Sequence, residues 1–248
     1  TLTDAVRMAF EAAAPDRVIA SWGHASGINI SGIDPTTGEQ YVTMILASII
    51  SGAGATQQMD GWHACGPLCC FGALSSGDIE LLEYQYPILI HKYGLAEDSG
   101  GAGKHRGGCG TVWEVEPLGH DMTVVAFGEG REYPTMGAAG AEQISPELKL
   151  GRLEIVHEDG VTDLYKQNTV TQISPGERAR NTNPGGGGYG NSFERDIAAV
   201  LKDVRERIIS IEAAKLEYGV VVDPKTLQVD EKQTAALREQ QKQQKKSA

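Results

Sequence analysis

DSGGAGKHRGGCG, at residues 98–110, is the stretch that most restricts the fold of this chain. It places glycines on both sides of Lys104, His105 and Arg106. Glycine lets a backbone turn tightly and approach another segment or a ligand where a Cβ atom would clash. A second run, NPGGGGYG at residues 183–190, follows far downstream. Two such loops predict a site, or a tightly packed junction, that is built by backbone shape.

The first loop does not match the common phosphate-binding patterns. A Walker A loop needs Gly-x4-Gly-Lys followed by Ser or Thr, but here Asp98 holds the first glycine position and His105 follows the lysine. The dinucleotide-binding fingerprint places its glycines between a buried strand and a helix. Residues 111–116, TVWEVE, alternate as a strand would. Nucleotide binding by this chain alone is therefore not expected.

The composition predicts a globular body and excludes a nucleic-acid-binding protein. A chain of 248 residues can bury about 70 to 75% of the surface of its unfolded form, which is enough for one sizeable core. Glycine supplies 31 residues, well above the usual ~7%. The formal charge of −11 offers no basic patch for a nucleic acid.

The sequence shows no signal for a membrane or for secretion. No apolar run reaches the ~18 residues of a membrane span, and no signal peptide opens the chain. The cysteines, at positions 65, 69, 70 and 109, are typical of free thiols in a reducing compartment. We therefore expect a cytoplasmic protein without a membrane partner.

The apolar pattern predicts an α+β fold with a β-rich mixed core, glycine-rich loops and a short helical C-terminal region. Apolar residues recur at helical spacing near the start of the chain, which predicts a first helix. Thr3 is its candidate N-cap, and Pro15 is expected to end it. The expected strands lie at residues 18–22, 111–116, 122–127, 153–157 and 162–165.

After the second glycine run, the apolar residues recur with the spacing of a helix. Apolar residues between Ile197 and Ile208 share one face, and the opposite face, which includes Asp203, is predicted to be solvated. Ser210 is a candidate cap for a second short helix that ends at Gly219.

The composition shifts toward Gln and Lys near the end of the chain. Residues 225–248 are typical of a solvated helix or a disordered tail outside the core. We therefore expect a single α+β domain over residues 1–224, followed by this polar tail.

Four segments together resemble one known family. They are LTDAVRMAFEAAAPDRVIA at residues 2–20, YPILIHKYGLAEDSGGAGKHRGGCGTVWEVEPL at 86–118, ISPGERARNTNPGGGGYG at 173–190, and the continuation from the second glycine run to residue 223. The chain resembles the C-terminal half of the B-type subunit of the hydantoinase B/oxoprolinase family, to which subunits of acetone and acetophenone carboxylases are related.

The resemblance implies an activity that depends on a partner. Members of the family work with an actin-like ATPase, a hydantoinase A-like subunit or fused domain that binds ATP and activates the substrate. The B-type subunit then completes either amide hydrolysis or ketone carboxylation. We expect part of an ATP-dependent cyclic-amide hydrolase of the hydantoinase or 5-oxoprolinase type, with a small-molecule substrate. A ketone carboxylase subunit, or a structural module without chemistry of its own, remains an alternative.

The resemblance also implies that a metal-bearing region lies elsewhere. Family members are much longer, and their metal motif, Asn-Asp-Pro-Tyr followed by His-x-x-Asp, lies in the N-terminal half. The Asp-Pro pairs of this chain begin at Asp34 and Asp223, and neither lies in such a motif. We therefore expect the divalent metal in a missing N-terminal half that acts as a second partner, and no metal in this portion. The chain would be a split-gene product, a processed fragment or a truncation.

The candidates for substrate or anion binding lie on two loops. Lys104 and Arg106 suit a phosphorylated intermediate or a carboxylate, and His105 suits proton transfer near neutral pH. The alternative is that the cations tie the loop to acidic groups such as Asp98 or Glu114. The full set of candidates is Asp60, His63, Asp98, Lys104, His105 and Arg106.

The glycines of both loops are expected to shape the backbone and not to bind through side chains. These positions are Gly100, Gly101, Gly103, Gly107, Gly108, Gly185, Gly186, Gly187 and Gly188.

Two other kinds of chemistry are weaker alternatives. His63, Cys65, Cys69 and Cys70 could ligate zinc, although their spacing is not that of a standard zinc finger and buried free thiols fit better. Thr1 could act as an N-terminal nucleophile with its own amine as base, although the residues after it favour a helix.

Overall fold

The computed structural model describes residues 2–70, 72, 74–165 and 168–247. The described helices are α1 (Leu2–Glu11), α2 (Ile79–Gln85), α3 (Ile197–Arg205), α4 (Ile211–Tyr218) and α5 (Glu231–Ser247). Single turns of 3-10 helix lie at Pro15–Arg17, Leu46–Ile49, Leu68–Cys70, Pro146–Lys149 and Ser192–Glu194. No helix in the described ranges has the length and apolar character needed to cross a membrane.

The strands form two antiparallel sheets, so the fold is α+β, as predicted. One sheet has the order β2-β1-β5-β8 and consists of β1 (Ser26–Ile33), β2 (Gln40–Met44), β5 (Met122–Gly128) and β8 (Thr169–Ile173). The other has the order β3-β4-β9-β6-β7 and consists of β3 (Ile88–Leu95), β4 (Thr111–Pro117), β6 (Arg152–Val156), β7 (Thr162–Tyr165) and β9 (Arg178–Thr182).

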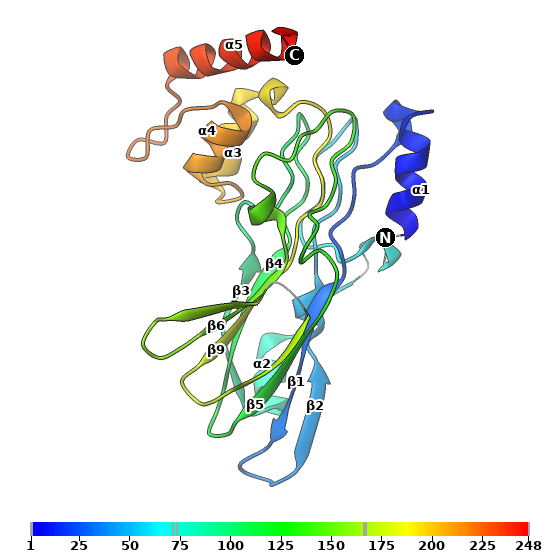
Figure 1. The fold of residues 1–248 in the computed structure, drawn as a ribbon. Coiled ribbons are helices and arrows are strands. Elements are labelled where there is room, and N and C mark those ends of the chain that lie inside the picture. Colours follow the sequence, from blue (N-terminus) through cyan, green and yellow to red (C-terminus); the bar gives the residue numbers. More distant parts are fainter. Residues whose placement is uncertain (1, 71, 73, 166–167, 248) are drawn as a thin grey trace.

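The two sheets enclose the largest apolar core. Alternate residues of each strand point inward, so Ile28 and Ile30 of β1 meet Trp113 and Val115 of β4, all 0% exposed. Figure 1 shows this sandwich in the lower half of the molecule, with long extended loops above it and helices α3, α4 and α5 at the upper left. The predicted strands at 111–116, 122–127, 153–157 and 162–165 are confirmed as β4 to β7.

The extended loops above the sandwich form a second body, which we call the glycine-rich bundle. It consists of residues 20–23, 51–55, 99–110, 135–138 and 183–190, which run beside one another without forming a regular sheet. The run at 183–190 lies at its centre. The Gly186 amide donates to Gly108, the Gly187 amide to Ser21, and the Gly187 carbonyl accepts from Ala55.

The bundle explains why the strand predicted at residues 18–22 does not form. The Ala20 amide donates to Ala55, and the Ser21 amide donates to Met136. The segment is extended, but its hydrogen bonds go to different segments in turn. A strand needs a continuous ladder to one neighbour, so the prediction was wrong in spite of the apolar run.

The C-terminal helices pack on one side of the bundle. Ser210 caps α4 by accepting from the Ala213 amide, and Gly219, at φ 63°, ends it, as predicted. Helix α1 begins at Leu2, so Thr3 lies inside it and is not its cap. Helix α5 is anchored more firmly than a free tail, because Thr234 is buried and accepts from the Val221 amide at 3.0 Å.

Candidate functional site

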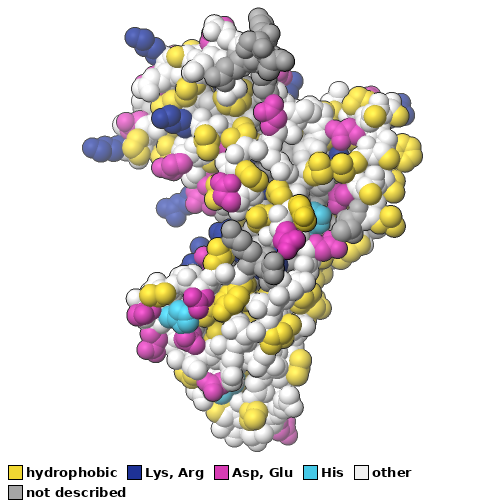
Figure 2. Space-filling view, viewed as in Figure 1, with side chains coloured by type: hydrophobic (Ala, Val, Ile, Leu, Met, Phe, Trp, Pro, Cys, Tyr) yellow, Lys and Arg dark blue, Asp and Glu magenta, His cyan; other side chains and the backbone are white. Residues whose placement is uncertain are grey.

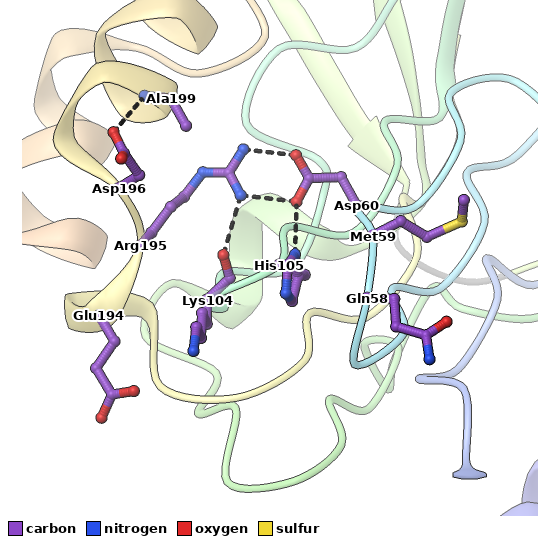
Figure 3. Close-up of a pocket in the computed structure, with 9 residues that line it drawn as sticks. All are labelled: Gln58, Met59, Asp60, Lys104, His105, Glu194, Arg195, Asp196 and Ala199. Atoms are coloured by element: carbon purple, nitrogen blue, oxygen red, sulfur yellow. Dashed lines mark hydrogen bonds and ion pairs between the residues drawn. The ribbon is translucent and has the colours of Figure 1, made fainter. Parts of the chain in front are cut away.

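A cleft of about 480 Å³ lies where the glycine-rich bundle meets helix α3. Three segments line it: residues 58–60, residues 104–105 of the first glycine loop, and residues 194–199 at the start of α3. The sequence-predicted candidates Asp60, Lys104 and His105 therefore come together here (Figure 3).

Asp60 is held in the cleft by Arg195. The guanidinium donates from Nη1 to Oδ1 at 2.7 Å and from Nη2 to Oδ2 at 2.6 Å, which is a two-pronged pair. The Arg106 amide also donates to Asp60 Oδ1 at 2.8 Å. Figure 3 shows the two side chains facing one another across the floor of the cleft. Asp60 thereby joins the loop at 58–60 to both the first glycine loop and the segment just before α3.

A second acidic residue closes the network from helix α3. Asp203 Oδ2 accepts from Arg106 Nε at 3.2 Å and from Arg195 Nη2 at 2.9 Å. Arg106, Arg195 and Asp203 are each 4–5% exposed. The two guanidinium charges are therefore balanced by Asp60 and Asp203, and Arg106 does not line the cleft.

The network sets the charge state of Asp60. Burial by itself raises the pKa of this carboxyl, but the hydrogen bonds and charge of Arg195, together with the charge of Arg106, outweigh burial and hold the pKa below its usual value. Asp60 is thus a carboxylate at neutral pH and cannot supply a proton there.

Lys104 and His105 contribute the basic groups of the cleft, which the acidic residues Glu194 and Asp196 also line. Lys104 is exposed, and no salt bridge of its ammonium occurs among the described residues. His105 Nδ1 lies 3.8 Å from Asp60 Oδ1, beyond hydrogen-bond distance but close enough for attraction when the ring is protonated. This pair can bind an anion and exchange a proton in the space that the cleft provides.

His63 lies behind the cleft, and a backbone amide fixes the tautomer of its neutral ring. Its Nδ1 accepts from the Cys109 amide at 2.9 Å, so the neutral ring carries its proton on Nε2. The Nε2 atom is 3.4 Å from Arg106 Nη2, and two donors face one another there. Burial first, and then the Arg106 charge, lower the pKa of His63.

Asp98 lies at the start of helix α4, away from the cleft. Its Oδ1 accepts from the Ser210 amide at 2.7 Å, and its carbonyl oxygen accepts from Lys149 Nζ at 2.6 Å. Glu114 is also elsewhere, on β4, where it pairs with Arg178 and Arg180. The alternative therefore holds for Arg106 alone, whose acidic partners are Asp60 and Asp203 in place of Asp98 or Glu114, and no ion pair of Lys104 occurs among the described residues.

The predicted backbone-shaping glycines lie at close approaches between bundle segments. A Cβ atom on Gly107 would lie 1.9 Å from the Gly186 carbonyl oxygen, and one on Gly186 would lie 2.0 Å from that of Ala53. Close backbone contacts of the same kind surround the other positions, which are Gly100, Gly101, Gly103, Gly108, Gly185, Gly187 and Gly188. These contacts hold the loop that carries Lys104 and His105.

The cysteine-rich segment does not form a cluster of ligands. The Cys69 and Cys70 Sγ atoms lie 3.9 Å apart, whereas the Cys65 thiol donates to the His63 carbonyl oxygen. Within the described part of the chain, no group of three or more His, Cys, Asp or Glu side chains could hold a metal ion. Thr1, the other alternative, lies outside the described residues.

Sequence reasoning missed the two residues that complete the network. Arg195 follows the second glycine run by only a few positions, and that proximity was the available signal. Asp203 was assigned to the solvated face of α3 but is 5% exposed, so that prediction was wrong. The reason is that Arg106 and Arg195 cover this side of the helix, and a buried carboxylate is stable when it is paired in this way.

The comparisons with known proteins decide the family. The model of hydantoinase B/oxoprolinase matches residues 1–192. The chain belongs to the hydantoinase B/oxoprolinase family. It is 64% identical over 239 residues to the caprolactamase subunit beta of Pseudomonas jessenii, and the match covers 96% of the chain and 41% of that subunit.

Two further comparisons agree with membership in this family. The crystal structure of ATP-dependent caprolactamase from Pseudomonas jessenii matches with a TM-score of 0.85 and 56% identity, over 94% of this chain and 40% of that one. The acetophenone carboxylase delta subunit of Aromatoleum aromaticum is 26% identical over 249 residues, covering 88% of this chain and 36% of that subunit. The chain thus spans about two fifths of these relatives.

Proposed function

We propose that this chain is part of an ATP-dependent cyclic-amide hydrolase and acts with an ATPase-type partner subunit of the hydantoinase A kind. The observation that carries the proposal is the 64% identity to a caprolactamase subunit beta across 96% of the chain. In the overall reaction, water adds to the lactam carbonyl carbon, the ring C–N bond breaks, and the nitrogen takes a proton. A second water is consumed overall as ATP is converted to ADP and phosphate. Free thiols at all four cysteines favour a cytoplasmic location.

The cleft gives this chain a specific role in that reaction. Lys104 supplies a positive charge to an anionic intermediate, and His105 beside it carries a proton. Arg106 holds the same loop in place and does not bind the substrate, because its guanidinium is already bound by Asp203. The glycine contacts form the wall that positions both side chains.

ATP and the metal belong to other parts of the enzyme in this proposal. ATP binds the partner subunit, and the divalent metal binds the portion of the subunit that the longer relatives have. The described residues hold no cluster that fits a metal.

A ketone carboxylase is the second candidate. The 26% identity to an acetophenone carboxylase delta subunit supports it, and the cleft suits bicarbonate-derived anions as well as lactam-derived ones. A non-catalytic interface module is the third, and the balanced charges of Arg106 and Arg195 support it.

The test is substrate-dependent ATP turnover by the native complex. The complex that contains this chain is isolated from its source, and ADP release is measured with ε-caprolactam, hydantoin and 5-oxoproline. A second series uses acetone and acetophenone with bicarbonate. The proposal predicts that a cyclic amide triggers ADP release without a ketone or bicarbonate. Release only with a ketone and bicarbonate would favour the carboxylase, and no release with any substrate would favour the interface module.

A further inference from the structure

Helix α1 is attached to the molecule by its polar face. Asp4, Arg7 and Glu11 lie on one stripe of the helix, at spacings of three and four residues, and are less exposed than their neighbours. Arg7 Nη2 donates to Ser21 Oγ at 3.5 Å, and Glu11 Oε1 accepts from the Ala139 amide at 2.8 Å. A helix on the surface of a globular protein ordinarily packs its apolar face inward. Helix α1 has the reverse orientation.

The apolar face of the helix consequently points away from the body. Leu2, Val6 and Phe10 follow one another at intervals of four residues and are 79%, 50% and 62% exposed. No residue of α1 is buried. In Figure 2 hydrophobic side chains gather at the upper right, over the position of α1 in Figure 1.

The segment on which α1 rests also lines an apolar hollow. The hollow has a volume of about 100 Å³ and lies beside Ser21. It is lined by Ile19 and Trp22, which flank Ser21 in the sequence, and by Met59 and Trp62. Trp22 Nε1 is buried there and has no acceptor in the part of the chain that the structure describes. Because that N–H is already out of reach of solvent, the feature that a further segment can fill is the apolar hollow itself.

The charges favour a protein over a membrane as the occupant. Helices that lie on membranes carry Lys and Arg along the polar face, whereas α1 has only Arg7, which is paired with Glu11 at 3.1 Å. The whole chain carries a formal charge of −11, which anionic lipid would repel.

Helix α1 needs a partner for its apolar face, and relatives of this chain are long enough to supply one. A helix of ten residues has little stability of its own in water and depends on the packing of its apolar face. The caprolactamase subunit beta that is 64% identical to this chain has a further portion, since the chain spans only 41% of it. We propose that this further portion of the subunit covers the outer face of α1 and fills the hollow beside it. The portion can belong to the same polypeptide or to a companion chain.

Site-specific photocrosslinking tests this interface in the protein as it exists. Phe10→p-benzoylphenylalanine is introduced in the native source, the cells are irradiated, and crosslinked peptides are identified by mass spectrometry. The expected product joins residue 10 to a peptide that aligns with the portion of subunit beta that this chain lacks. Adding Val6→Asp is expected to remove most of that product and leave the far-ultraviolet circular dichroism spectrum unchanged, because no residue of α1 is buried within this chain.

A matched exposed aromatic serves as the control. Tyr84→p-benzoylphenylalanine, at a side chain that is 89% exposed on α2, is expected to give no such product. A crosslink from residue 10 to a second copy of this chain, to the ATPase-type subunit, or to nothing would overturn the proposal. The readout is independent of activity. The expected crosslink without lactam-dependent ATP turnover would support the interface and contradict the hydrolase. Lactam-dependent ATP turnover without the crosslink would support the hydrolase and contradict the interface.

Discussion

Lys104 and Arg106 stand two positions apart on one loop but have opposite surroundings. Lys104 is exposed in the cleft, whereas Arg106 is 4% exposed and bound to Asp203. The residue types of the loop indicated that both cations bind an anion, with a structural role as the alternative. In the structure Lys104 faces the cleft, and Arg106 lies in the buried network. No sequence pattern could reveal this division, because it depends on Asp203 and Arg195 from a distant helical segment.

Lys104 provides the residue-scale test of the cleft. Lys104→Gln is expected to lower kcat/KM of the native complex by about 10- to 100-fold, because one preorganised positive charge is lost. The free energy of unfolding should change by less than about 0.5 kcal/mol, since the side chain is exposed. Steady-state kinetics and urea unfolding measure the two quantities. Lys225→Gln, at an exposed turn outside the cleft, should leave both unchanged, and equal effects of the two variants would refute the assignment.

His63 and His157 provide a pH test with opposite signs. The pKa of His63 is lowered by burial and by Arg106, so the unfolded chain takes up a proton first as the pH falls below about 6.5. His63 therefore costs stability in that range. The pKa of His157 is raised by its hydrogen bonds to Glu177 and Asp163, so its contribution is complete below about pH 6.5 and is lost as the pH rises.

Urea unfolding at about pH 7.5 and about pH 5.5 separates the two histidines. His63→Asn keeps an acceptor for the Cys109 amide and should make the loss of stability at the lower pH smaller than in the wild type. His157→Asn should make that loss larger. Changes of the same sign in both variants would contradict the protonation states derived for them.

Sequence patterns predicted the elements whose formation depends on residues close together in the chain. Strands β4 to β7 follow the alternation of their side chains, and α4 begins and ends at the predicted Ser210 and Gly219. Prediction failed where hydrogen bonds come from several distant segments. The extended run at residues 18–22 has no single neighbour, and the face of α3 that carries Asp203 is covered by Arg106 and Arg195.

The glycine-rich bundle predicts a graded response to added methyl groups. A Cβ on Gly186 would meet backbone at 2.0 Å, one on Gly101 would meet it at 2.7 Å, and one on Gly77 has nothing within 4 Å. Gly186→Ala is therefore expected to destabilise the chain by at least about 3 kcal/mol, Gly101→Ala by less, and Gly77→Ala by under about 0.5 kcal/mol. Thermal unfolding of the three variants gives the order. Equal midpoints for all three would mean that the segments do not approach closely.

Helix α5 predicts a loss of stability when its anchor is removed. Arg238 donates from Nε to the Tyr218 carbonyl at 3.1 Å and from Nη2 to the Arg195 carbonyl at 2.8 Å. Arg238→Ala should lower the free energy of unfolding by about 1 to 3 kcal/mol, because two charge-assisted hydrogen bonds are lost. Lys242→Ala, on the exposed part of the same helix, is the control for urea unfolding. A similar effect of both variants would mean that α5 is held only by its own helical structure.

The whole molecule combines a β-sandwich, which has an apolar core, with a bundle in which backbone hydrogen bonds and close glycine contacts join the segments. The glycine content and the two loops predicted a junction built by backbone shape, and the resemblance predicted the family, which is confirmed. The arrangement of the strands into two sheets could not be predicted, since it depends on pairings between distant segments such as β4 and β9. The outward apolar face of α1 was also hidden, because the sequence shows an amphipathic helix without showing which face meets the body.

The most direct test of the central claim is the coupling between ATP use and ring opening. The native complex is supplied with ATP and ε-caprolactam without bicarbonate, and ADP and the ring-opened amino acid are measured together over time. A cyclic-amide hydrolase predicts that both products rise in a constant ratio and that neither rises faster when a ketone and bicarbonate are added. ADP formation without ring-opened product, or product formation only from a ketone with bicarbonate, would contradict the assignment.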